Sequence, residues 1–246
     1  APLTVKHVVE VDGVCKQETQ TFPAEMFYAK EASLLIVRNG VLACGTTPEA
    51  ILEEAKGMGY DKKMFSAKHG AQGFVVNKNA RWNNCIADKG QQADILNKKG
   101  TVETFSELPE LTKIRNGIGE FFGEPWTKLD AETNYYYVDP KTPTGIGFHG
   151  DTERNVVVGV RVGASMKLDF QWWYQNRPIG TRFSMELHSG DMYAISFKTL
   201  GKDWGKSVWP TLRHAAGHEK YRKSNETILG AIQKRRAKRR YSMTKS

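Results

Sequence analysis

Three side chains in the sequence could bind one metal ion. His149 and Asp151 flank a single glycine, and a strand-like run from Asn155 to Val162 follows them. A neutral imidazole and a carboxylate separated by one small residue can both turn toward the same cation. One more histidine from elsewhere would give two imidazoles and one carboxylate, a set that leaves three positions open on Fe(II). The spacing therefore predicts a metal centre with room for a co-substrate and O2.

The third ligand must come from another part of the chain. His214 ends a strand-like run and precedes three small residues, which leave space beside a ligand. We expect His214 to complete the centre, with His218 as the alternative. His188 lies in the turn-like sequence Leu-His-Ser-Gly-Asp and is predicted to be solvated.

The elements that must position these residues are mainly β-strands. Alternating apolar and polar runs extend from Pro125 to about residue 215, with turn signals at 140–143, 176–178 and 188–191. Strands of this length and spacing are typical of a jelly roll or barrel. A late strand of such a fold can return to the mouth where an earlier His-x-Asp lies. The pattern therefore predicts that His214 and His149 meet.

The N-terminal half combines hairpins and helices. Two pairs, Asp12-Gly13 and Asn39-Gly40, are hairpin signals. Thr47 is predicted to cap a helix that begins at Pro48 and ends near Gly57. A second helix is expected from a cap at Ser106 to Gly123, since the apolar residues between them have helical spacing.

Residues 77–84 mix cations, amides and one indole ring. Such a mixture can stack against unpaired nucleic-acid bases, so Arg81 and Trp82 are candidate substrate-binding residues. A polar loop held by one buried Trp82 is an equally supported hypothesis.

Composition narrows the class of protein. The 246 residues carry a formal net charge of +9, and residues 233–240 contribute a dense basic run. This excess favours a polyanionic partner such as nucleic acid, although the same run could be a nuclear-localisation patch. Three widely spaced cysteines, Cys15, Cys44 and Cys85, indicate a reducing compartment, so an intracellular, cytoplasmic or nuclear protein is expected. No apolar run approaches the roughly 20 residues of a membrane span.

Four sequence elements in order resemble the AlkB family of Fe(II)/2-oxoglutarate dioxygenases. They are Asn134-x-Tyr136, His149-x-Asp151, the late His214 and Arg240-x-Ser242-x-Thr244. The resemblance covers roughly residues 130–246, and the N-terminal half is only loosely similar to the family's lid region.

The resemblance implies a role for each matching residue. His149, Asp151 and His214 would bind Fe(II). Asn134, Tyr136 and Arg240 would hold 2-oxoglutarate, and Glu153 would lie near the substrate base. The implied fold is mainly β with flanking helices (α+β), with a double-stranded β-helix (jelly-roll) core at 121–246. The extension at 1–120 would be an α/β substrate lid.

The implied activity is oxidative demethylation or hydroxylation of alkylated nucleic-acid bases, with 2-oxoglutarate and O2 as co-substrates. The base would have to be single-stranded or flipped out of a duplex. Ser246 stands where the family has a substrate-holding Arg, so a protein or small molecule is an alternative substrate. A non-catalytic RNA-binding module is a further alternative. The sequence does not define the oligomeric state.

Two Arg-x-Ser sequences follow His214, and either arginine could bind the far carboxylate of 2-oxoglutarate. Arg222 has the shorter spacing. Arg240 has the better context, because Tyr241 to Thr244 alternate as a strand does. We expect Arg240 to be the anchor, with the segment 218–238 forming a basic helix on the surface.

Overall fold

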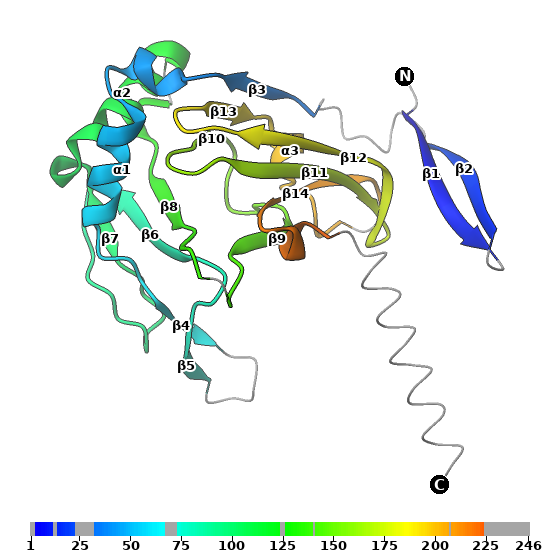
Figure 1. The fold of residues 1–246 in the computed structure, drawn as a ribbon, viewed down its shortest axis with the longest axis horizontal. Helices are drawn as coiled ribbons and strands as arrows, with labels where there is room; N and C mark the ends of the chain where they lie inside the picture. The colour runs from blue at the N-terminus through cyan, green and yellow to red at the C-terminus, as the bar shows by residue number, and fades with distance from the viewer. Residues whose placement is uncertain are drawn as a thin grey trace, which may run out of the picture.

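Two β-sheets that face one another form the centre of the structure (Figure 1). The computed structural model describes residues 32–66, 73–123, 126–139, 141–206 and 208–223, and the backbone of residues 3–11 and 14–22. The four-stranded sheet has the order β12-β11-β14-β9, and the three-stranded sheet has the order β10-β13-β3. Their bounds are β12 Arg177–Leu187, β11 Met166–Tyr174, β14 Thr211–Gly217, β9 Gly145–His149, β10 Val157–Val160, β13 Met192–Ile195 and β3 Leu34–Val37.

The main apolar core lies between these sheets. Leu168 and Phe170 of β11 and Leu212 of β14 pack from one side, and Ile195 of β13 packs from the other. Alternation of side chains along each strand gives every second residue to this core, which is the pattern that the sequence predicts. All pairings within both sheets are antiparallel. The chain is therefore mainly β, as expected.

Helices cover the other face of the three-stranded sheet. Ile51 of α1 (Pro48–Gly57) and Ile114 and Ile118 of α2 (Pro109–Phe122) share a second core with Val158 and Val160. The predicted flanking helices are therefore confirmed. Figure 1 shows α1 and α2 side by side at one end of the sheets.

The start of α1 agrees with the sequence, and the start of α2 does not. Thr47 caps α1 by accepting a hydrogen bond from the Ala50 N–H. The prediction that Ser106 caps the second helix is wrong, because Ser106 lies within the 3-10 turn η3 (Phe105–Glu107). The N–H groups of Glu110 and Leu111, which have no acceptor within the helix, instead donate to the carboxylate of Glu54 on α1, each at 2.8 Å. A partner on another helix therefore replaces the local cap.

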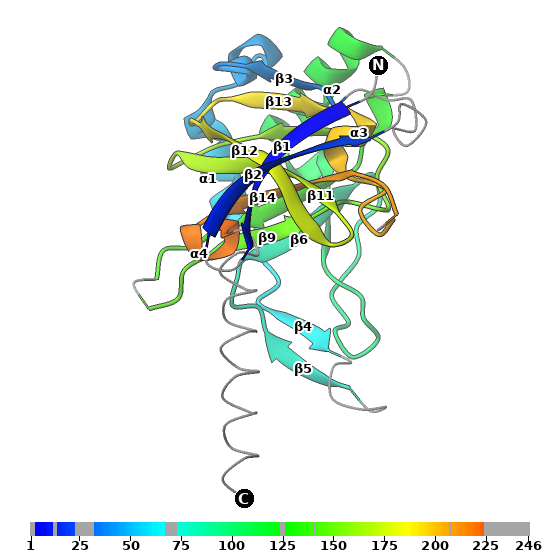
Figure 2. The ribbon, with the colours of Figure 1, turned by 90° about the vertical axis from the view of Figure 1, so that its right-hand side faces the viewer.

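A smaller sheet, β7-β6-β8, packs against these helices. Its strands are β7 Val102–Thr104, β6 Trp82–Ala87 and β8 Ala131–Tyr135. The hairpin of β4 (Lys63–Ser66) and β5 (Phe74–Asn77) projects from this end of the molecule, as Figures 1 and 2 show. We call β6, β7 and β8 the lid sheet.

The two predicted hairpins have different outcomes. Strands β1 (Leu3–Val11) and β2 (Val14–Phe22) pair with Val11 opposite Val14, as the Asp12-Gly13 signal predicts. Figure 2 shows this hairpin in front of β12. The prediction of a hairpin at Asn39-Gly40 is wrong. Asn39 has a φ of 51° and donates its N–H to Asp191 Oδ1, and the chain turns into η2 (Gly40–Cys44).

The remaining elements are short. Turn η4 spans Trp126–Lys128. Helices α3 (Phe197–Leu200) and α4 (Glu219–Arg222) flank β14. Helix α3 therefore lies within the region that the sequence predicts to consist of strands.

Strand β3 belongs to the predicted N-terminal extension but pairs with β13 of the predicted core. Among the described residues, no helix is long and apolar enough to cross a membrane.

Candidate metal centre

One strand pairing brings the two predicted histidine ligands together. Strands β9 and β14 are antiparallel neighbours, and His149 is directly opposite His214. Their ring centroids are 4.3 Å apart. On β14, His214 alternates with Leu212 and Ala216, which both belong to the core between the sheets. Both imidazoles therefore lie at the inner face of the four-stranded sheet.

Asp151 reaches the same place through a tight turn after β9. Its backbone N–H donates to Leu200 O at 3.1 Å. This contact draws Gly150 so close to α3 that a Cβ on it would lie 2.0 Å from the carbonyl oxygen of Gly201. The residue between the histidine and the aspartate must therefore be glycine for this turn to form.

The three side chains form a compact cluster. Their ligand atoms all lie within 4.8 Å of one another. Asp151 Oδ1 is 3.4 Å from His149 Nε2, and Asp151 Oδ2 is 3.9 Å from His214 Nε2. Neighbouring ligand atoms that bind one ion at about 2.1 Å are roughly 3 Å apart. Small side-chain rotations would therefore bring all three onto one metal ion.

Hydrogen bonds fix the ring of His149. Its Nδ1 lies 2.8 Å from Gly147 O and 3.1 Å from His214 O. Both partners are acceptors, so we assign the proton to Nδ1. The Nε2 lone pair then points toward Asp151, as a metal ligand requires. His214 Nδ1, in contrast, is buried without a hydrogen-bond partner among the described residues.

The protonation states also suit a metal. Burial, together with nearby His149, lowers the pKa of His214 to about 4, although Asp151 opposes this effect. Burial alone would raise the pKa of Asp151, but the neighbouring side chains of His149, His214 and Arg154 hold it below its usual range. At neutral pH the cluster thus offers a neutral His214 imidazole and a carboxylate.

Sequence reasoning missed Arg154 and Glu132, which connect the cluster to the lid sheet. Arg154 Nη1 lies 3.8 Å from Asp151 Oδ2, and Arg154 Nη2 donates to Glu132 Oε2 on β8. Asn83 on β6 then donates to the other oxygen of Glu132 at 3.3 Å. The only sequence signal for Arg154 is its position three residues after Asp151. The link itself depends on the packing of β8 beside the cluster.

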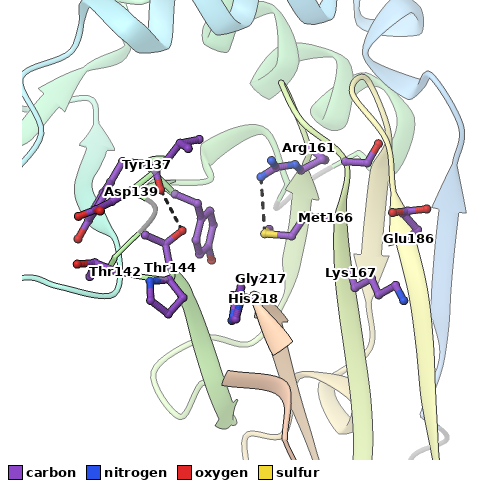
Figure 3. A pocket seen from close by; sticks show the side chains of 14 residues that line it. Tyr137, Asp139, Thr142, Thr144, Arg161, Met166, Lys167, Glu186, Gly217 and His218 are labelled. Carbon is purple, nitrogen blue, oxygen red and sulfur yellow. Dashed lines mark hydrogen bonds between the residues drawn. The ribbon is translucent and has the colours of Figure 1, made fainter. Parts of the chain in front are cut away.

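A separate pocket of about 370 Å³ lies between the start of β11 and the segment that follows β8 (Figure 3). Tyr136 lines it, and burial raises the pKa of Tyr136. Arg161 also lines it and donates to Ala164 O through Nε at 2.7 Å. Burial lowers the pKa of Arg161. The side chain of Arg161 therefore lies at this pocket, half-buried.

The structure places the other predicted residues as follows. Asn134 Oδ1 accepts a hydrogen bond from Arg81 Nε, so a predicted cofactor residue contacts a predicted substrate residue. Glu153 lies beside Arg154, with 3.8 Å between Glu153 Oε1 and Arg154 Nε. Trp82 lies on strand β6 and not in a loop. Arg240 lies outside the described residues.

The alternatives to His214 and Arg240 have other roles. His188 is exposed and contacts Ser165 at 2.9 Å, as expected of a turn residue. His218 caps α4 by accepting from the Lys220 N–H. Arg222 donates through Nη1 to both oxygens of buried Asp169, at 3.1 and 2.9 Å. A dicarboxylate would have to displace Asp169 to use Arg222.

Comparison with known proteins gives one informative match. No model of a known protein family matches the sequence. The chain is similar to the uncharacterized protein R156 of Acanthamoeba polyphaga mimivirus, with 38% identity over 192 residues. The match covers 78% of this chain and 72% of the viral protein.

Proposed function

We propose that this chain, which belongs to the same family as the uncharacterized mimivirus protein R156, is an Fe(II)/2-oxoglutarate-dependent dioxygenase. The observation that carries the proposal is the cluster of His149, Asp151 and His214. Two imidazoles and one carboxylate that approach from one side are the donor set of oxygenases that leave positions open on Fe(II). When bound, the metal would couple the oxidative decarboxylation of 2-oxoglutarate to oxidation of a substrate C–H bond.

Each residue of the cluster would contribute a distinct property. Asp151 supplies the negative charge that offsets part of the metal's charge. His149 presents Nε2 because its Nδ1 is committed to carbonyl oxygens. The low pKa of His214 keeps its imidazole neutral and available. Arg154 orients the Asp151 carboxylate from the side, as partners of metal ligands usually do.

The co-substrate would bind beside the cluster, on the side of Tyr136. We propose that the two facing sheets are the double-stranded β-helix of this enzyme class, with Asn134, Tyr136 and Arg240 holding 2-oxoglutarate. The engagement of Arg222 by Asp169 favours Arg240 as the anchor. Arg161 supplies a second cation beside Tyr136.

We propose alkylated nucleic-acid bases as the substrates. The net charge of +9 favours a polyanion. The face of the lid sheet that Glu132 joins to the metal cluster carries Asn83 and Asn134, which lie directly opposite each other on β6 and β8. Amide side chains can hydrogen-bond the edge of a base. Glu153 and Arg81 would contribute to substrate binding around this face, and Trp82 would contribute from the opposite face of the lid sheet.

The decisive experiment measures Fe(II) binding without O2, followed by turnover. Anaerobic calorimetry should detect one Fe(II) per chain, and 2-oxoglutarate should bind only to the Fe(II)-loaded protein. Succinate should then form in air, with formaldehyde when a methylated oligonucleotide is present. Metal binding without succinate would refute the oxygenase. Succinate without formaldehyde across methylated DNA and RNA would refute the nucleic-acid substrate and favour a protein or small molecule.

Replacement of Arg240 tests the co-substrate anchor. Loss of a charge pair worth about 2 kcal/mol corresponds to about 30-fold in affinity. Arg240→Gln should therefore raise the 2-oxoglutarate concentration needed for half-maximal succinate formation at least that much, with Fe(II) affinity unchanged. If Arg161→Gln gave this phenotype and Arg240→Gln did not, the anchor would be Arg161.

A further inference from the structure

The turn that carries Asp151 rests on a short loop that follows α3. Asp151 donates its backbone N–H to the end of α3, and Gly150 lies against the carbonyl oxygen of Gly201. A Cβ on Gly150 would also lie 2.9 Å from Trp204 Cβ. We call residues 201–206 the brace loop. Because these backbone atoms are in close contact, the position of the brace loop limits where Asp151 can lie.

The brace loop also touches β14, the strand that carries His214. Gly201 has a φ of 73°, and a Cβ on it would lie 2.3 Å from Leu212 O and 3.1 Å from Gly150 Cα. Only glycine fits between β14 and the turn after β9 in this conformation. Three backbone segments thus meet at one point, and two of them carry proposed metal ligands.

Arg213 contacts the brace loop from the outer side of the four-stranded sheet. Its buried side chain alternates along β14 with that of the neighbouring His214, so the two point to opposite faces. The guanidinium carbon lies 4.5 Å from the centroid of the Trp173 ring and 5.2 Å from that of the Trp204 ring. A cation at this distance from an aromatic ring is attracted to it, most strongly where water is excluded. Arg213 is therefore attracted both to a ring of the sheet and to a ring of the brace loop.

The hydrogen bonds of Arg213 also join the sheet to the brace loop. Its Nη2 donates to Asn176 Oδ1 at 2.8 Å and to Trp204 O at 3.3 Å. Asn176 lies in the turn between β11 and β12, so it belongs to the four-stranded sheet. One planar guanidinium thus holds both the ring and the backbone of Trp204, which the single ammonium group of a lysine could not do.

A second buried cation keeps the brace loop attached to the fold. Lys198 of α3 is buried, and its Nζ donates to Asp203 Oδ2 at 2.6 Å and to Pro210 O at 2.8 Å. Asp203 belongs to the brace loop, so this contact does not depend on Arg213. Loss of the Arg213 contacts should therefore shift the brace loop without detaching it.

We propose that Arg213 is a positioning residue of the metal centre, which holds the brace loop against the turn that presents Asp151. Arg213 would act through Trp204 and Gly150 and would not itself contact the metal or a substrate. The proposal rests on the proposed function in that Asp151 is taken as a metal ligand. The position of Asp151 can also be measured in the metal-free protein, so the two proposals are tested separately.

The first test measures amide hydrogen exchange by NMR in the full chain after metal has been removed. The Asp151 N–H donates to Leu200 O at 3.1 Å, so its exchange rate reports how often the turn opens away from α3. Loss of a desolvated contact between a cation and a ring corresponds to about 10- to 30-fold in an equilibrium constant. In Arg213→Met, which keeps the apolar bulk, the Asp151 amide should therefore exchange faster than in wild type by about that factor. Arg213→Lys keeps only the charge and should not restore the wild-type rate.

Arg115→Met is the matched control for a general loss of stability. Arg115 of α2 also lies over an aromatic ring, with its guanidinium carbon 4.3 Å from the Phe105 centroid, but it is not part of the brace loop or its contacts. This variant should leave the Asp151 exchange rate at the wild-type value. Urea unfolding of each variant checks that the whole fold is retained.

A second test measures Fe(II) affinity by anaerobic calorimetry. Loss of a residue that orients a metal ligand typically lowers metal affinity about 10- to 100-fold. We expect about 10-fold for Arg213→Met, because Arg213 acts through another residue. Trp204→Ala should have a similar effect. The double variant Arg213→Met/Trp204→Ala should be little worse than either single variant, because both substitutions break the same contact.

Three results would overturn the proposal. The first is an Asp151 exchange rate in Arg213→Met that equals the rate in Arg115→Met. The second is additive effects of Arg213→Met and Trp204→Ala on that rate. The third is faster Asp151 exchange with unchanged Fe(II) affinity. Wild-type protein that binds no Fe(II), with faster Asp151 exchange in Arg213→Met, would instead refute the oxygenase and support Arg213 as the residue that positions the turn.

Discussion

The metal centre and a stack of four aromatic rings are built in opposite ways. We call these rings, those of Tyr60, Tyr135, Trp82 and Tyr137, the aromatic platform. The metal centre takes its three ligands from two adjacent strands and the turn after one of them, and the groups are polar and mostly buried. The platform takes its rings from the segment after α1 and from the region of β6 and β8, and it opens to solvent. The metal centre holds three ligand groups close together in a buried place, whereas the platform is a row of rings at the surface of the lid sheet.

This difference predicts different responses to mutation. A metal site depends on every ligand, because two protein ligands hold Fe(II) poorly. A stack of rings adds several ring–ring contacts to the stability of the fold, so removal of one ring should have a partial effect. The link from Asp151 through Arg154 and Glu132 is where the two regions could influence each other.

The largest effect is expected at the metal ligands. His149→Ala, His214→Ala and Asp151→Asn should each abolish Fe(II) binding in anaerobic calorimetry and 2-oxoglutarate turnover. Asn lacks the charge that offsets the metal's charge. His188→Ala is the matched control, because His188 is exposed and away from the cluster. Full turnover by His214→Ala with none by His188→Ala would show that the ligand set is wrong.

Arg222→Gln should affect the scaffold and neither site directly. The substitution leaves fully buried Asp169 with the Ser184 hydroxyl, which donates to Oδ1 at 2.6 Å, and with the partly exposed Arg182, whose Nη1 lies 3.5 Å from Oδ2. Breaking a buried pair costs about 3–5 kcal/mol, and we expect about 3 kcal/mol in urea unfolding because Arg182 remains.

The double variant Asp169→Asn/Arg222→Gln removes both charges and should recover part of that stability. If Arg222→Gln unfolded at the wild-type urea midpoint but required more 2-oxoglutarate, Arg222 would be the co-substrate anchor after all.

Arg154→Lys tests the link between the two regions. Lysine keeps the charge but cannot contact Asp151 and Glu132 with one planar group. Loss of a residue that orients a metal ligand typically costs about 10- to 100-fold in metal affinity, and we expect that range here. Calorimetry with Fe(II) is the measurement, and exposed Arg177→Lys on β12 is the control. Unchanged Fe(II) affinity would mean that Arg154 serves only the packing of β8.

The smallest effect on both sites is expected at Asp191, which contacts Arg38, Asn39 and His188 and no residue of either site. Burial alone would raise the pKa of Asp191, but hydrogen bonds from the His188 and Asn39 N–H groups and from Arg38 lower it. A lowered pKa stabilises the fold above the unfolded value of about 3.9, and this stability is lost as pH falls through the folded-state pKa.

Asp191→Asn should therefore lose about 1–3 kcal/mol at pH 7 and show a shallower loss of stability toward pH 3. Urea unfolding at both pH values measures this. Fe(II) affinity and oligonucleotide affinity should stay at wild-type values. Equal acid sensitivity of the two proteins would show that Asp191 does not contribute to the pH dependence.

The sequence alone predicted the features that depend on nearest neighbours in the chain. The cap of α1 at Thr47, the β1–β2 hairpin and the alternation of the strands follow from local backbone preferences and side-chain period. The pairing of His-x-Asp with a late histidine was also predictable, since antiparallel strands return to the same place. The requirement for Gly150, however, comes from the close approach of α3.

Tertiary structure alone decided the contacts between distant segments. No local pattern shows that Glu54 caps α2, that Asp191 holds Asn39 in its left-handed conformation, or that Asp169 engages Arg222. The same holds for the aromatic platform, because residues 77–84 contribute only Trp82 to it. Propensity and spacing act over a few residues, whereas burial and charge pairing depend on which segments the fold brings together.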